Sequence, residues 1–260
     1  MDELARAFAF EEALRERCAE RIIPFPCGRA LFNDTYPRVW ELNALRVDVS
    51  ADATAEGLAT EAERLHREAG HEHRRVVVPD ERAGAKLERD FRFLDWRIER
   101  FLFMAYRGEG SKARSDDAVE VDAAAHRPLR EEIARAEPWA TDEDVVQMVL
   151  DADELFFRHG NARHFAALAD GTFVSAAELL SDGRTAQVEN VVTHPAFRGR
   201  GLASAVVGRA VGEAVAAGHD FVFLVADDAD WPKELYARLG FAPIGREWSF
   251  LRPPVPDDPV

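Results

Sequence analysis

Residues 187–205, QVENVVTHPAFRGRGLASA, combine residue types and spacing that are suited to binding a phosphate. An apolar run of β type leads into a loop that holds Arg198, Gly199, Arg200 and Gly201, and a helical pattern begins directly after it. The free N–H groups of such a turn and the positive end of the helix dipole attract anions. Glycine lets a phosphate approach the backbone, and arginine adds charge. The segment therefore predicts a loop that binds a pyrophosphate.

A dinucleotide-binding turn is the alternative interpretation of this loop. Gly199-x-Gly201-x-x-Ser204 nearly fits the pattern G-x-G-x-x-G/A. Rossmann domains place that turn after their first strand and end the second strand with an acidic residue. Here three expected strands come before the turn, and Asp220 begins the next strand instead of ending it. The order of elements therefore disfavours a nicotinamide-dependent oxidoreductase.

The downstream half of the sequence supplies the elements that would position this loop. Asp170-Gly171 and Asp182-Gly183 predict hairpin turns, and Thr141 with Asp144 predicts a capped helix start. We expect a strand at 118–122, helices at 127–136 and 142–158, strands at 163–169, 172–180 and 184–193, a helix at 201–217, a strand at 221–226, a helix at 231–239 and a strand at 243–251.

The upstream half shares the end of this order. We expect a helix at 2–20, an irregular segment at 24–37, a strand at 39–48, a helix at 56–69, a strand at 74–78, a helix at 81–90 and a strand at 96–105. Leu87…Phe93 aligns with Leu235…Phe241 without a gap, which suggests an internal repeat. Hairpins followed by a strand–helix–strand crossover predict a mixed α/β sheet.

A polar segment separates the two halves. Residues 107–117 read RGEGSKARSDD, without apolar periodicity, which is typical of a linker. We therefore divide the chain into an N-terminal domain at 1–110, a linker at 111–117 and a C-terminal domain at 118–260.

Two motifs of the downstream half resemble the GNAT acetyltransferase superfamily. The first is Val191-Val192-Thr193 followed by Arg198-Gly199-Arg200-Gly201-Leu202-Ala203. The second, Leu235-Tyr236-Ala237-Arg238-Leu239-Gly240-Phe241, is similar to the family's Y-x-K-L-G-F helix end, with Arg for Lys. The resemblance covers about residues 118–252 and implies a GNAT-like fold, an α/β fold with a mixed sheet.

The upstream half looks like a degenerate GNAT-like copy, so that the chain as a whole would be a tandem. Where its pyrophosphate loop would lie, residues 48–57 read DVSADATAEG, without an arginine. Glu88 takes the position that aligns with Tyr236. We therefore expect no cofactor site in this half.

The resemblance also implies a role for each motif residue. Acetyl-CoA would be the co-substrate, with its pyrophosphate on the segment from Arg198 to Ala203 and its thioester and pantetheine on the backbone of Val191, Val192 and Thr193. Glu189 would be the base that takes a proton from the acceptor amine, and Tyr236 would donate to the leaving thiolate.

Other acidic residues leave alternatives open. Glu178, on the preceding expected strand, is a second candidate for the base. Asp227, Asp228 and Asp230 could hold a cationic substrate, or they could cap the helix that begins near Trp231.

Composition limits the remaining functional classes. The chain has 260 residues, with 33 basic and 48 acidic side chains and a net charge of -15, which disfavours nucleic acid and anionic membranes as partners. Two cysteines exclude a disulfide framework and a four-cysteine zinc site. His71 and His73 follow Gly70 in a polar turn, where we expect surface histidines, so no metal is expected.

No apolar run approaches the roughly 18 residues of a membrane span, and the charged N-terminal segment is unlike a signal peptide. We therefore expect a cytoplasmic protein, as a monomer or homodimer, without a membrane partner.

The sequence thus predicts an acyltransferase, namely an acetyl-CoA-dependent N-acetyltransferase acting on a primary amine of a small molecule or a protein. The alternative is a non-catalytic CoA-binding sensor or interaction module. Both need the segment from Arg198 to Ala203, whereas only the enzyme needs Glu189 and Tyr236. The acceptor itself is not specified by any motif.

Overall fold

The structure is a computed structural model that describes residues 2–49, 52–108 and 117–254. Contacts between Cα atoms divide the chain into two compact units. Unit 1 comprises Met1–Leu14, Phe103–Ala226 and Asp230–Ile244; unit 2 comprises Arg15–Leu102, Asp227–Ala229 and Gly245–Val260. The expected linker at 111–117 lies almost wholly outside the described residues, so the division at that segment stays a prediction.

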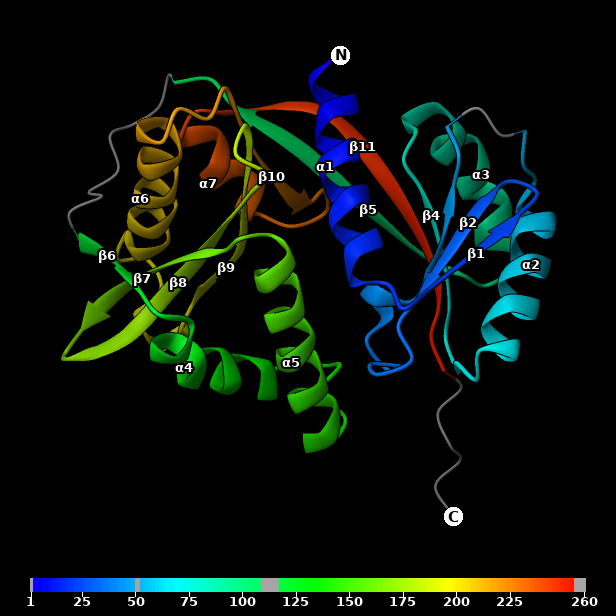
Figure 1. Cartoon of the computed structure of the whole chain (residues 1–260), viewed down its shortest axis with the longest axis horizontal. Coiled ribbons are helices and arrows are strands. Elements are labelled where there is room, and N and C mark those ends of the chain that lie inside the picture. The colour runs from blue at the N-terminus through cyan, green and yellow to red at the C-terminus, as the bar shows by residue number, and fades with distance from the viewer. Residues whose placement is uncertain (1, 50–51, 109–116, 255–260) are drawn as a thin grey trace. The chain divides into compact units, whose positions relative to one another are not determined.

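Unit 1 contains the predicted loop. Its elements are the start of α1 (Glu3–Cys18), β6 (Ala118–Val121), α4 (Ala123–Arg135), α5 (Glu143–His159), β7 (Arg163–Ala169), β8 (Thr172–Ser181), β9 (Thr185–Thr193), α6 (Leu202–Ala216), β10 (Phe221–Asp227) and α7 (Pro232–Arg238), with parts of β5 (Arg97–Tyr106) and β11 (Phe241–Arg252). The strand order is β11-β5-β10-β9-β8-β7-β6. Helix α6 covers one face of β7–β9, and α4 and α5 lie on the other (Figure 1).

Local sequence signals set the turns and helix starts of unit 1. Asp170 and Gly171, with φ of 53° and 79°, form the expected tight hairpin between β7 and β8. The predicted cap of α5 was wrong. The N-cap is Asp142, whose carboxylate accepts a hydrogen bond from the backbone N–H of Val145 at 2.9 Å. An acid at the N-cap satisfies a free amide and also complements the helix dipole.

Unit 2 contains the end of α1, β1 (Arg21–Phe25), β2 (Gly28–Phe32), a short 3-10 helix (Trp40–Leu42), β3 (Ala44–Val47), α2 (Ala55–Glu68), β4 (Arg74–Val78) and α3 (Glu81–Phe93), with parts of β5 and β11. The strand order is β1-β2-β3-β4-β11-β5.

The structure corrects two of the elements expected in unit 2. The segment expected to be irregular contains a hairpin, in which β1 tolerates Pro24 because it is an edge strand. Gly28 is required there, since a Cβ at that position would lie 2.1 Å from the carbonyl oxygen of Arg46. The strand expected at 39–48 is shorter, because its first residues form the 3-10 helix.

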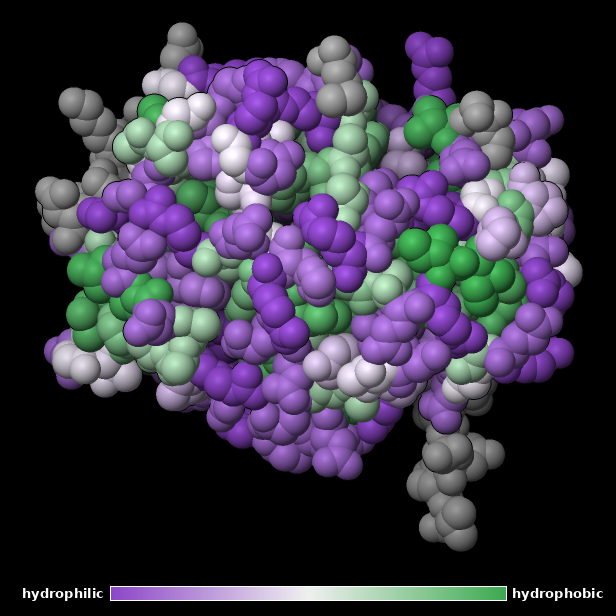
Figure 2. All heavy atoms as spheres, viewed as in Figure 1, coloured by the Kyte–Doolittle hydropathy of each residue, from purple (hydrophilic) through white to green (hydrophobic). Residues whose placement is uncertain are grey.

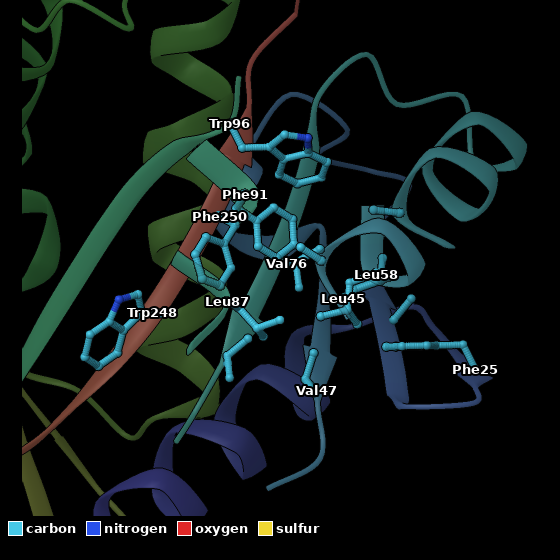
Figure 3. Packing of buried hydrophobic residues seen from close by; sticks show 14 of the residues in the cluster. Phe25, Leu45, Val47, Leu58, Val76, Leu87, Phe91, Trp96, Trp248 and Phe250 are labelled. Atoms are coloured by element: carbon cyan, nitrogen blue, oxygen red, sulfur yellow. The ribbon is translucent and has the colours of Figure 1, made fainter. Parts of the chain in front are cut away.

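The core of unit 2 combines aliphatic side chains with a group of aromatic rings (Figure 3). Phe91 of α3 stacks on Phe250 of β11, with ring centroids 4.0 Å apart, and Trp96 packs against Phe91 at 5.0 Å. Trp248 of β11 lies over Gly84 of α3, where its ring occupies the space that a larger side chain would take. The helix is therefore held against β11 by shape as well as by burial.

The expectation that His71 and His73 lie at the surface was wrong. Both are buried, and with the fully buried His66 they form a cluster whose ring centroids are 5.0–5.6 Å apart. Burial lowers the pKa of His66 to about 2, of His73 to about 3 and of His71 to about 4. All three rings are therefore neutral near pH 7 and act as aromatic packing.

The two units repeat one order of elements. In unit 2 the antiparallel strands β1, β2 and β3 are followed by α2, the strand β4 parallel to β3, then α3 and β5. In unit 1 the antiparallel strands β7, β8 and β9 are followed by α6, the strand β10 parallel to β9, then α7 and β11. The internal repeat suggested by the sequence is thus present in the topology.

The face drawn in Figure 2 is mostly hydrophilic, with hydrophobic side chains in separate patches, as the net charge of -15 leads one to expect. Within residues 2–49, 52–108 and 117–254, every helix is too short or too polar to cross a membrane.

Candidate active site

Strand β9 separates from β10 halfway along its length. The parallel pairing begins at Phe221↔Thr185 and ends at Leu224↔Val188. On its other edge β9 stays paired with β8 as far as Ser175↔Thr193. The segment from Glu189 to Thr193 is therefore bonded on the β8 side only, and backbone groups on the opposite edge can bind a ligand.

A bulge marks the point of separation. Ala176 pairs with Val192 and Glu178 pairs with Glu189, so one residue of β8 faces two residues of β9. Asn190, one of those two, has φ of 47°, in the left-handed region that few residues other than glycine adopt. Bulges bend a strand and redirect its side chains, and they are frequent beside active sites.

The predicted phosphate loop has open space over its backbone. After a short 3-10 turn (Pro195–Phe197), Gly199 and Gly201 have φ of 76° and 83°, and a Cβ built at either would meet no atom within 4 Å. Helix α6 begins at Leu202, and no side chain caps its N-terminus. Its first amides thus stay available to an anion, which is the arrangement that a pyrophosphate needs.

The two arginines of the loop have no carboxylate partner within the described parts of the chain. Arg198 donates from Nε to the carbonyl oxygen of Thr193 at 3.3 Å, and the guanidinium of Arg200 lies 4.9 Å from the ring centre of Phe197. Other arginines of unit 1 are neutralised; Arg163, for example, pairs with Glu120 at 2.7 Å. The positive charges of Arg198 and Arg200 are therefore free to attract a phosphate.

The other predicted cofactor-binding residues adjoin this loop. Val191, Val192 and Thr193 are half-buried at the end of β9, and Leu202 and Ala203 form the first turn of α6. The hydroxyl of Ser175 on β8 donates to the carbonyl oxygen of Val192 at 2.8 Å, which holds this end of β9 in place. The whole predicted cofactor-binding set thus lies on the end of β9, the loop after it and the start of α6.

Glu189 is half-buried at the start of the separated segment. The side-chain amide of Gln187, which is fully buried, donates to Oε1 of Glu189 and to Oε1 of Glu11 on α1. These contacts fix the orientation of the Glu189 carboxylate. Sequence reasoning missed Gln187, although it lies two residues before Glu189 and hence on the same face of the strand.

Tyr236 is buried in α7 and its ionisation is linked to Glu189. Burial, together with the negative charges of Glu189 and Asp230, raises the pKa of Tyr236 to about 12. The phenol therefore stays protonated throughout the physiological range and can donate a hydrogen bond. The negative charge of Glu189 contributes to the raised pKa of Tyr236, so the two predicted catalytic groups interact electrostatically.

The remaining acidic candidates are committed elsewhere. Glu178 is fully buried on β8 and is in no position to meet an amine that arrives from solvent. Asp227 and Asp230 accept hydrogen bonds from the backbone N–H groups of Ala229 and Trp231, and Asp228 accepts one from Arg246 at 2.9 Å. Asp227 and Asp230 therefore shape the turn before α7, but neither caps the helix, because its N-cap is Trp231 and no side chain makes a capping hydrogen bond.

Comparison with known proteins agrees with this geometry. Residues 126–241 match the model of the acetyltransferase (GNAT) family. No curated protein shows significant similarity to the chain.

Solved structures resemble the chain over nearly its whole length. A functionally unknown conserved protein from Staphylococcus epidermidis has a TM-score of 0.73 at 16% identity, covering 91% of this chain and 95% of its own. A GCN5-related N-acetyltransferase from Kribbella flavida has a TM-score of 0.64 at 19% identity, with coverage of 96% and 95%. A tandem GNAT protein from the clavulanic acid biosynthesis pathway has a TM-score of 0.56 at 15% identity, with coverage of 88% and 79%.

These likenesses identify the fold, and the family match identifies the domain. The chain carries a GNAT domain at residues 126–241, within a mixed α/β fold that matches tandem GNAT architecture, as the sequence predicted.

Proposed function

We propose that this GNAT-domain protein is an acetyl-CoA-dependent N-acetyltransferase that transfers an acetyl group to a primary amine of a small molecule or a protein. The observation that supports it most is the separation of β9 from β10, with Glu189 at the start of the separated segment. This segment leads into a loop that contains two glycines and two arginines, and the helix after the loop has no side-chain cap. A binding strand edge, an anion site and a carboxylate thereby adjoin one another in unit 1.

The loop and the strand edge would hold the co-substrate. Gly199 and Gly201 leave space for the pyrophosphate, and Arg198 and Arg200 supply positive charge that no carboxylate of the described chain neutralises. Backbone groups of Val191 to Thr193 would hydrogen-bond the pantetheine and the thioester carbonyl. Acetyl-CoA supplies an activated acyl group, and the remaining steps belong to the protein.

Glu189 is the candidate base. A primary ammonium with a pKa of about 10 is mostly protonated at neutral pH and cannot attack a carbonyl. A carboxylate that Gln187 holds at the mouth of the separated strands can accept the proton, directly or through one water molecule. The amine nitrogen then forms its bond to the acyl carbon.

Tyr236 is the candidate for assisting the leaving group. As the bond between the acyl carbon and sulfur breaks, negative charge gathers on a sulfur whose conjugate acid has a pKa of about 8.5. A phenol whose pKa is about 12 remains protonated and donates a hydrogen bond to that charge. The thiolate leaves in this stabilised form and takes up, through solvent, the second proton that the nitrogen loses as it becomes an amide.

The test combines turnover with binding. Purified protein should release free thiol from acetyl-CoA in the presence of at least one member of a panel of primary amines. In calorimetric titrations CoA should bind, and Gly201→Asp should abolish binding because it places a carboxylate against the phosphates.

Gly183→Asp is the matched control, since Gly183 also has a positive φ, of 90°, and open space around it, but lies in the hairpin between β8 and β9. Equal loss of CoA affinity in both variants would contradict the loop assignment. CoA binding without turnover on any amine would instead support the sensor alternative.

A further inference from the structure

Three side chains of unit 1 that have no part in the proposed acetyl transfer form a compact group. His126 on α4, His164 on β7 and Glu178 on β8 each direct one ligand-type atom toward the others, and these atoms all lie within 4.8 Å of one another. Nε2 of His126 is 3.2 Å from Nδ1 of His164. Oε1 of Glu178 is 3.6 Å from the first nitrogen and 3.7 Å from the second.

These separations match the edges of a tetrahedral coordination shell. Zinc binds imidazole nitrogen and carboxylate oxygen at about 2.1 Å, and tetrahedral angles then place two ligand atoms about 3.4 Å apart. The three observed edges, 3.2, 3.6 and 3.7 Å, bracket that value. Two imidazoles and one carboxylate are also a donor set that zinc and related divalent ions accept.

The carboxylate is otherwise unsatisfied. Glu178 and His126 have no exposed surface, and His164 is 8% exposed. Neither oxygen of Glu178 has a hydrogen-bond partner among the described residues, because both imidazole nitrogens are beyond hydrogen-bond distance. A buried carboxyl group without a hydrogen-bond partner is costly, and a bound metal ion would satisfy it.

The arginines of α4 near this group have acidic partners other than Glu178. Arg130, on the same helix as His126, is paired with Asp153 and lies 3.7 Å from Glu154, and Arg127 lies 3.8 Å from Glu154. Neither guanidinium therefore takes the place that a metal ion would have beside Glu178.

We propose that His126, His164 and Glu178 bind a divalent transition-metal ion, for which Zn²⁺ is the best fit. No further histidine, cysteine or acidic residue of the described chain joins the group, so water takes the fourth position. The role is structural, because the group is buried away from arriving substrates. The ion fastens α4 to β7 and β8, and Glu178 is the cross-strand neighbour of Glu189, so the site supports the strand that carries the candidate base.

The experiment measures metal in the full-length protein. After zinc loading and gel filtration, elemental analysis should find about one Zn²⁺ per wild-type chain, and Co²⁺ loading should give the intense visible bands of a four-coordinate site. Glu178→Gln and His164→Gln should each weaken Co²⁺ affinity by roughly 100-fold or more, since even supporting contacts to metal ligands contribute 10–100-fold. Chelation should lower the melting temperature of the wild type.

His159→Gln is the matched control, because it removes a histidine at the end of α5 that is not part of the group. It should retain the metal and the Co²⁺ spectrum. Glutamine is similar in size to the glutamate or histidine that it replaces. Circular dichroism verifies that the glutamine variants are folded. The proposal is overturned if wild-type protein holds no metal after loading, or if folded Glu178→Gln retains it with unchanged affinity.

Neither result depends on acetyl transfer. Metal binding that is confirmed in a protein without turnover would leave this site standing while contradicting the proposed enzyme.

Discussion

Burial gives the phenol of Tyr236 a fixed protonation state, and this decides how the two candidate catalytic residues can be told apart. Because its pKa is raised to about 12, Tyr236 does not titrate between pH 6 and 10. The acceptor amine does approach its own pKa, about 10, across the upper part of that range. Removing the base should therefore give a pH-dependent defect, and removing the phenol a constant one.

We predict distinct pH–rate profiles for the two substitutions. Glu189→Gln should lower kcat most near neutral pH and recover part of the loss as pH rises, because more of the amine is then already deprotonated. Tyr236→Phe should lower kcat by something like 10²–10⁴ at every pH, with little change in CoA affinity. Steady-state rates from pH 6 to 10, with CoA titrations of both variants, provide the measurement. Wild-type kcat at neutral pH in Glu189→Gln would remove the base assignment.

The strand–loop–helix arrangement from Val191 to Ala203 was predictable because it is continuous in sequence. The cofactor-binding role of its residues stays a prediction. Gln187 escaped notice because a buried amide has no motif of its own. The group of His126, His164 and Glu178 is brought together by three different elements, and its members are 38 and 14 residues apart in the chain, beyond the reach of spacing rules for metal ligands.

Among the elements, α3 shows how tertiary packing overrides helix propensity. A glycine inside a helix normally costs about 1 kcal/mol relative to alanine. At Gly84, however, a Cβ would lie 2.6–2.8 Å from three ring atoms of Trp248, which is itself only 4% exposed. The glycine therefore makes room for the indole whose Nε1–H donates to Glu88 at 3.0 Å.

We predict that Gly84→Ala lowers the free energy of unfolding by about 1–3 kcal/mol, because overpacking against a rigid ring outweighs the gain in helix propensity. Urea unfolding followed by circular dichroism measures the change. Gly212→Ala in α6 is the matched control: nothing lies within 4 Å of its would-be Cβ, so it should stabilise by up to about 1 kcal/mol. If both substitutions stabilise the protein, the packing argument is wrong.

Elements with regular patterns were predicted closely, and those that depend on distant partners were not. The strand β4 has the expected bounds, 74–78, because it is a short run of β-branched residues between turns. The hairpin of β1 and β2 was missed because Pro24, Pro26 and Gly28 locally indicate irregular structure. Only the pairing of β2 with β3 shows that the glycine serves a close approach of two strands.

At the scale of the whole molecule, the two units share their order of elements but differ at the connection that would bind a phosphate. Helix α6 follows two glycines of positive φ and has no side-chain cap. Helix α2 is capped by Thr54, whose hydroxyl accepts a hydrogen bond from the backbone N–H of Gly57 at 3.2 Å. The cap uses an amide that an anion would need, and the exposed acids Asp48 and Asp52 repel one.

The residue of unit 2 that aligns with Tyr236 is also unlike its counterpart in unit 1. Glu88 accepts a hydrogen bond from Trp248 and pairs with Arg92 at 2.8 Å, so its carboxylate supports the core of unit 2. A carboxylate in that place offers a leaving thiolate no proton and adds repulsion. Unit 2 therefore shares the order of elements of unit 1 but lacks the features that we propose for phosphate binding and for assisting the leaving group in unit 1.

We predict that one CoA binds per chain, at the loop of unit 1. Isothermal titration of the full-length protein should give a stoichiometry of one, and Gly201→Asp should remove all binding, because no second site remains. A working site at the start of α2 would give two CoA molecules per wild-type chain and leave one in the Gly201→Asp variant. Any saturable binding that remains in the variant would have to come from unit 2.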